Sequence, residues 1–105
     1  MIVTFEGKTP RIHPTAWVAE TACLIGDIEI GPESTVWPGA VLRADFSSII
    51  VGSNTHIEDN SVVHAVRPMT IGDNVTIGHG VVVHAARIGN CVLLSNNSTI
   101  LNDAE

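Results

Sequence analysis

Three histidines lie in apolar runs whose spacing raises the question of a shared site. His79 and His84 belong to the run IGHGVVVHA, and His64 belongs to the earlier run SVVHA. A strand would place His79 and His84 on opposite faces, and a helix would separate them by more than one turn. Imidazole is a common metal ligand. The rings can therefore bind the same metal ion only if the chain repeats with a period other than that of a strand or a helix.

The chain repeats an aliphatic residue every six positions, often followed by glycine. A helix needs a period near 3.6 and an amphipathic strand a period of two, so a period of six fits neither. Such a repeat predicts a parallel β-solenoid in which each hexad forms one side of a triangular coil. The register positions are Ile12, Val18, Leu24, Ile30, Val36, Leu42, Val51, Ile57, Val63, Ile71, Ile77, Val83, Ile88, Leu94 and Ile100.

The fifteen hexads predict about five coils over residues 12–105, after a lead-in of residues 1–11. The fifth position of a hexad is often small, which suits the corners where the walls converge. Three hexads are irregular: those of Leu42 and Val63 carry extra residues, and that of Val83 is one residue short. All three fall on the same predicted side of the prism. We expect a site or an interface there.

The register predicts how the histidines are grouped. His64 and His84 hold the second position of successive hexads on one face, so they should stack about one strand spacing apart, with Arg43 in the same column. His79 holds a third position on the neighbouring face, directly beside Asp59. It could join the His64–His84 pair only from another subunit, across a threefold axis. Three imidazoles and an open position are typical of a catalytic zinc site.

Composition excludes several classes of partner. The formal net charge of −6 argues against nucleic acid and against an anionic membrane surface. No apolar run approaches the roughly 18 residues of a membrane span, and no signal peptide is visible at the N-terminus. Cys23 and Cys91 provide neither a disulfide framework nor a CxxC metal motif. We expect a cytoplasmic protein.

Three segments together resemble the γ-class carbonic anhydrases and their close bacterial relatives: VWPGAVLRAD, IEDNSVVHA and TIGHGVVVHAARIGN. The resemblance implies an all-β fold, the left-handed parallel β-helix, and a homotrimer with one metal at each subunit interface. It implies Zn²⁺, or Fe²⁺ or Co²⁺, as the cofactor and the reversible hydration of carbon dioxide to bicarbonate as the reaction, a lyase activity. By resemblance the metal ligands are His64, His79 and His84. The Arg43 and Asp45 pair would help to hold the trimer, and Glu58 and Asp59 would lie beside the metal.

The chain departs from this family in ways that predict a slow or cryptic enzyme. Glu58 stands where glutamine is usual, and Phe46 stands where the prototype has an acidic residue. The loop of residues 66–70 offers no carboxylate to export protons. The further coils, the C-terminal helix and the Asn and Tyr that the family places near the metal have no counterpart in this sequence.

Two alternatives stay open. One is a non-catalytic, metal-binding trimer with a structural role, which the changes at Glu58 and Phe46 favour. The other is a hexapeptide-repeat acyltransferase, which uses an interface histidine as general base and needs no stoichiometric metal. Three histidines in ligand register weigh against the acyltransferase.

Overall fold

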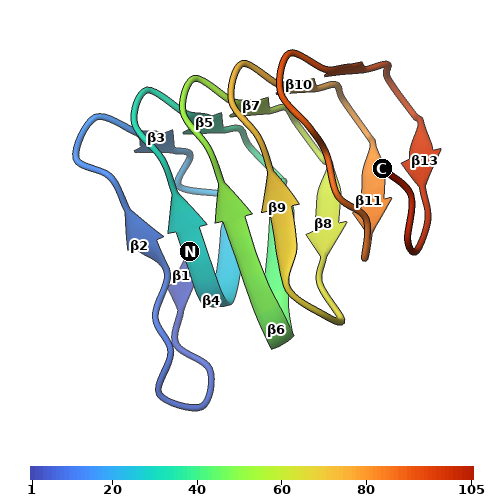
Figure 1. Cartoon of the computed structure of the whole chain (residues 1–105). Coiled ribbons are helices and arrows are strands. Elements are labelled where there is room, and N and C mark those ends of the chain that lie inside the picture. Colours follow the sequence, from blue (N-terminus) through green and yellow to red (C-terminus); the bar gives the residue numbers. More distant parts are fainter.

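A computed structural model describes residues 1–105, and every regular element in it is a strand. The strands wind into a left-handed parallel β-helix whose coils stack along one axis from the N-terminal to the C-terminal end (Figure 1). The fold prediction is confirmed. The strands are β1 Ile2–Val3, β2 Arg11–Ile12, β3 Trp17–Val18, β4 Cys23–Ile30, β5 Thr35–Val36, β6 Val41–Val51, β7 His56–Ile57, β8 Val62–His64, β9 Met69–Ile71, β10 Thr76–Ile77, β11 Val82–His84, β12 Leu93–Leu94 and β13 Thr99–Ile100.

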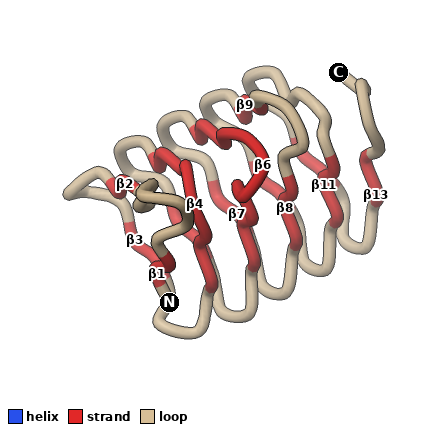
Figure 2. The backbone as a smooth tube through the Cα atoms, turned by 90° about the horizontal axis from the view of Figure 1, so that it is seen from below, coloured by secondary structure: helices blue, strands red, loops and turns tan.

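The parallel strands form the three faces of the prism (Figure 2). The β8 face pairs β1, the first part of β4, the first part of β6, β8, β11 and β13. The β9 face pairs β2 with the later parts of β4 and β6, and then β9. The β10 face pairs β3, β5, β7, β10 and β12, so five coils are present. Because β4 and β6 each run around a corner, they join two of the faces.

The inward column of each face forms the core. On the β8 face, Leu42 pairs with Val63 and Val63 with Val83, and all three are fully buried. This register confirms that the three irregular hexads share one face. A hexad repeat buries one aliphatic side chain per wall per coil, and each removes about 1.5–3 kcal/mol of unfavourable hydration. Five of the small residues expected at the corners are fully buried: Ala22, Ser34, Ala40, Thr55 and Ser61.

One corner is formed by residues in the left-handed backbone region and carries His79. Asn60, Gly80 and Asn97 hold the equivalent position in successive coils, with φ values of 61°, 63° and 62°. A Cβ at Gly80 would lie 2.6 Å from Asn97 Oδ1, so glycine relieves both strain and crowding there. His79 directly precedes this turn, and the turn fixes the position of His79 at the junction of the β10 and β8 faces.

The N-terminal segment adds a strand that the hexad pattern does not predict. Ile2 and Val3 of β1 pair with Leu24 and Ile25 of β4, which extends the β8 face by one strand. The chain then forms a tight antiparallel hairpin between Phe5 and Lys8 before β2 begins. The structure contains no helix that is long and apolar enough to cross a bilayer.

Candidate metal centre

His64 and His84 stack on the β8 face as the register predicts. Strands β8 and β11 pair so that His84 lies opposite His64, and the two ring centroids are 5.0 Å apart with an interplanar angle of 62°. Arg43 of β6 occupies the same column one coil earlier. His64 is buried, with 7% of its surface exposed, whereas His84 is half-buried. Parallel pairing of adjacent coils therefore brings two predicted ligands together within one chain.

Charged groups on β6 hold the imidazole of His64. Arg43 Nη2 lies 3.4 Å from His64 Nδ1, and Asp45 Oδ1 lies 3.3 Å from His64 Nε2. A guanidinium can only donate, so Nδ1 accepts and Nε2–H donates to the carboxylate. Arg43 Nε is itself 3.8 Å from Asp45 Oδ1. Arg43 and Asp45 therefore lie side by side within one chain.

Asp45 is held in its ionised form. Burial by itself would raise its pKa, but backbone amides, the charge of Arg43 and the hydrogen bond from His64 outweigh that effect. The pKa of Asp45 is lowered below its ordinary value of 3.8. A stable negative charge therefore lies beside the His64–His84 pair at neutral pH.

His79 lies on the other side of the corner, with carboxylates as neighbours. Its Nδ1 is 3.2 Å from Asp59 Oδ1, and its backbone N–H donates to Asn96 Oδ1 over 2.9 Å. The candidate ligand atoms of Glu58, Asp59 and His79 all lie within 4.8 Å of one another. The predicted Asp59–His79 column is confirmed, and the structure brings Glu58 into the same cluster.

A single chain does not bring all three predicted ligands together. The Glu58–Asp59–His79 cluster is the only set of three potential ligands whose atoms lie within 4.8 Å of each other, and it includes neither His64 nor His84. The side chain of His79 is 58% exposed. It is therefore free to reach a second protein chain.

Asn102 also contacts the histidine pair, although the hexad pattern does not single it out. Its Oδ1 lies 2.6 Å from His84 Nδ1. Asn102 is two residues beyond the register position Ile100, so the six-residue repeat alone does not predict that it contacts His84. The contact depends on the path of the chain after β13.

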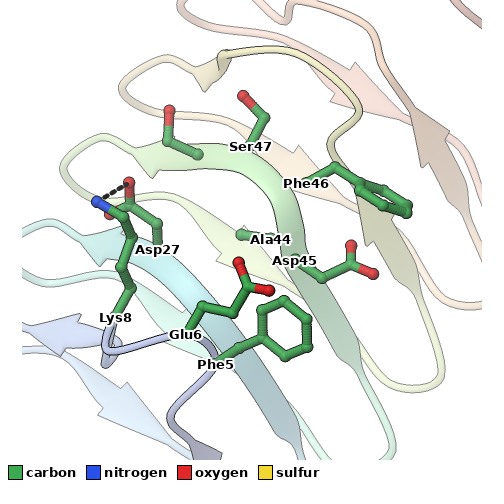
Figure 3. A pocket seen from close by; sticks show the side chains of 9 residues that line it. Phe5, Glu6, Lys8, Asp27, Ala44, Asp45, Phe46 and Ser47 are labelled. Atoms are coloured by element: carbon green, nitrogen blue, oxygen red, sulfur yellow. Dashed lines mark ion pairs between the residues drawn. The ribbon is translucent and has the colours of Figure 1, made fainter.

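A cavity of about 260 Å³ opens beside Asp45, between the N-terminal hairpin and the bend of β6. Figure 3 shows the Glu6 carboxylate directed into it, with the rings of Phe5 and Phe46 along its margin and Lys8 paired with Asp27 over 4.0 Å. The Phe46 ring centroid is 6.3 Å from that of His64. The cavity thus borders the histidine pair through Asp45 and Phe46. Its lining residues are Phe5, Glu6, Lys8, Asp27, Ala44, Asp45, Phe46, Ser47 and Ser48.

Comparisons with known proteins agree with this architecture. Residues 68–102 match the family model described as bacterial transferase hexapeptide (six repeats). A carbonic anhydrase of Geobacillus kaustophilus is 37% identical over 107 residues, covering 100% of this chain and 59% of the relative. The mitochondrial gamma carbonic anhydrase 1 of Arabidopsis thaliana is 42% identical over 103 residues, covering 90% of this chain and 38% of the relative.

A solved structure shows the same fold. The hexapeptide transferase family protein of Anaplasma phagocytophilum superposes with a TM-score of 0.76 at 30% identity, covering 96% of this chain and 75% of that one. The two carbonic anhydrases are longer, and the chain spans about 59% and 38% of their lengths.

Proposed function

The chain belongs to the γ-carbonic anhydrase-like hexapeptide-repeat family, and we propose that it forms a homotrimer with a metal-dependent, carbonic anhydrase-like centre at each subunit interface. The ligands in this proposal are His64 and His84 of one chain and His79 of the next. The reaction is the reversible hydration of carbon dioxide to bicarbonate, at a slow rate. The cofactor is Zn²⁺, with Fe²⁺ or Co²⁺ as alternatives.

The observation that carries the proposal is the separation of the ligands into two half-sites. His64 and His84 face each other on adjacent strands at a ring distance of 5.0 Å, and His79 extends from the next corner with most of its side chain exposed. One chain therefore offers two imidazoles at one place and one at another. A rotational assembly would complete each pair with the third imidazole of a neighbour.

The outward surface of the β8 face supports such an assembly. An apolar column runs beside the histidine column, and its members pair in register from β4 to β11: Cys23, Val41, Val62 and Val82. Val62 is 36% exposed in the single chain. A continuous apolar strip next to half of a metal site is what a subunit interface would bury.

The three imidazoles suit a divalent metal ion, for which His64 would exchange its contact with Arg43 or Asp45. Neutral imidazoles are ligands for zinc, iron and cobalt, and three of them leave a coordination position for substrate. An ion bound there would lower the pKa of a coordinated water to about 7 and so would supply the nucleophile. The Asp59 carboxylate lies 3.2 Å from His79 Nδ1, so Nε2 is the nitrogen of this ring left free to coordinate.

Two residues of the chain itself support a slow rate. Glu58 places a carboxylate beside His79, where it would accept a proton or repel an anion. Phe46 places an apolar ring 6.3 Å from His64 instead of a proton-accepting group. Proton export would then limit turnover.

The test is carbon dioxide hydration by the purified protein after loading with zinc, cobalt or, without oxygen, iron. Metal content and oligomeric state are measured on the same samples. We expect one metal per chain, a trimer and a kcat/KM well below the diffusional regime of ~10⁸ M⁻¹s⁻¹. A rate near that regime would contradict the slow centre, and a monomer without metal would contradict the whole proposal.

A structural, metal-binding trimer is the second candidate, and Glu58 and Phe46 favour it. It would bind metal and assemble but remain inactive with all three ions. An acyltransferase would assemble without stoichiometric metal, so metal content and hydration activity together separate the three candidates. The unpaired thiols of Cys23 and Cys91 support a reducing compartment, and we place the protein in the cytoplasm.

A further inference from the structure

We infer that Asn102 is a positioning residue for the metal centre, because its carboxamide oxygen sets the His84 ring to coordinate through Nε2. The inference rests on the proposed function, since it assumes that His84 is a ligand. It concerns a residue of the fifth coil that neither the hexad register nor the motif resemblance assigns to the site.

The backbone around Asn102 is fixed on both sides. Strand β13 pairs with β11 so that Ile100 lies opposite Val83. Directly after Asn102, the N–H of Asp103 donates to the carbonyl of Ala85 over 3.0 Å. The two anchors place the short side chain of Asn102 against His84, with Oδ1 in hydrogen-bond contact with Nδ1 at 2.6 Å.

The hydrogen bond determines which nitrogen of His84 is free. A carboxamide oxygen can only accept, so Nδ1 of His84 must carry the proton and donate it. The lone pair of a neutral ring is then on Nε2, the nitrogen left for a metal. Partners of this kind orient metal-bound imidazoles, and their loss typically lowers metal affinity 10–100-fold.

The three proposed ligands differ in whether a hydrogen bond holds the tautomer that coordinates through Nε2. The Asp59 carboxylate lies 3.2 Å from His79 Nδ1, but no hydrogen bond fixes the tautomer of that ring. His64 instead accepts at Nδ1 from Arg43 and donates from Nε2 to Asp45. His84 is therefore the preorganised member of the His64–His84 pair, and Asn102 is what preorganises it.

The oxygen and nitrogen of the Asn102 carboxamide have nearly the same shape, and exchanging them would reverse the conclusion. With Nδ2 toward His84, the ring would accept at Nδ1 and carry its proton on Nε2, which would block coordination. Asn102→Asp separates the two cases because an ionised carboxylate of the same shape can only accept. Asn102→Ala removes the contact altogether.

The experiment measures Co²⁺ affinity by chelator competition and visible absorption for wild type, Asn102→Ala and Asn102→Asp. The matched control is Asn90→Ala, which removes a comparable hydrogen bond of 2.8 Å to the Asp73 N–H but touches no histidine. Sedimentation and thermal melting confirm that each variant assembles and folds. We expect Asn102→Ala to bind about 10–100-fold more weakly, with Asn102→Asp and Asn90→Ala within about threefold of wild type.

A second measurement reads the tautomer directly. Long-range ¹H–¹⁵N spectra of metal-free protein, with His84 assigned by His84→Gln, should show protonation at Nδ1 in wild type. An Nε2-protonated His84, or an Asn102→Ala variant that binds Co²⁺ as tightly as wild type, overturns the inference and leaves the proposed function standing. A wild-type protein that binds no Co²⁺ overturns both.

Discussion

The imidazole of His84 lies one coil beyond that of His64, with ring centroids 5.0 Å apart. This relationship follows from strand pairing, because residues that occupy the same register position in adjacent coils must lie one strand spacing apart. Twenty residues of sequence separate the two histidines, and the separation is a full turn of the prism. A ligand pair is thus built into the helical repeat, and completing the site needs only a third donor.

His79→Ala should abolish stoichiometric metal binding and leave the trimer intact. Loss of a ligand costs more than the 10–100-fold typical of a hydrogen-bonding partner of a ligand, so affinity should fall by more than about 100-fold. Metal content and sedimentation of the same preparation provide the measurement. His13→Ala is the control, because the ring of that histidine, in the first coil, hydrogen-bonds only to Thr15. Metal retained in His79→Ala would reject the intersubunit site.

Arg43→Ala should weaken subunit association. Arg43 lies in the histidine column with its side chain 48% exposed, beside Asp45, so assembly would bury a charged pair. A tenfold rise in the dissociation constant, ~1.4 kcal/mol, is expected from analytical ultracentrifugation over a dilution series. Arg87→Ala is the control for loss of an arginine elsewhere. An unchanged sedimentation profile at low concentration would show that Arg43 does not support the interface.

Asp45→Asn should flatten the acid limb of the stability profile. The pKa of Asp45 is lower in the folded chain than its ordinary 3.8, so the unfolded chain binds more protons between the two values. The stabilisation is therefore present above about pH 3.8 and is lost as the pH falls through the folded value. Thermal melting between pH 2.5 and 6 should show a shallower decline for the variant. Glu20→Gln is the control, and its stability should decline as steeply as that of wild type. An equally steep decline in Asp45→Asn would assign the acid sensitivity to other groups.

Ser61→Ala should destabilise the corner that precedes the β8 face. The buried hydroxyl donates to the carbonyl of Gly78 over 2.6 Å and accepts from the N–H of Val81 over 3.1 Å. Its removal leaves two backbone groups without partners, at a cost of about 1–3 kcal/mol in the free energy of unfolding. Chemical denaturation measures this loss directly. A loss below about 0.5 kcal/mol would mean that water replaces the hydroxyl.

Glu58→Gln should raise the carbon dioxide hydration rate of the metal-loaded protein. The change removes a negative charge from the cluster around His79 without altering the size of the side chain. We expect about a tenfold gain in kcat/KM, which corresponds to ~1.4 kcal/mol of the barrier. Glu29→Gln, on the β9 face, should have no effect. Equal rates in wild type and Glu58→Gln, at equal metal content, would remove Glu58 as the cause of slow turnover.

Much of the fold could be predicted because each hexad repeats the same local requirement. An aliphatic residue every six positions specifies an inward column, and small residues such as Ala40 and Ser61 specify the corners where no larger side chain fits. Strand β1 and the Phe5–Lys8 hairpin could not be predicted in this way, because they lie outside the repeat. Their positions depend on an open edge of β4, which only the folded coil presents.

The sequence by itself determined the columns, since strict periodicity converts residue number into position. It therefore placed His64 over His84 and Asp59 beside His79. The tertiary structure decided what the side chains do within those columns. The tautomers follow from where Arg43, Asp45 and Asn102 point, and these directions depend on bends and turns that a repeat does not encode.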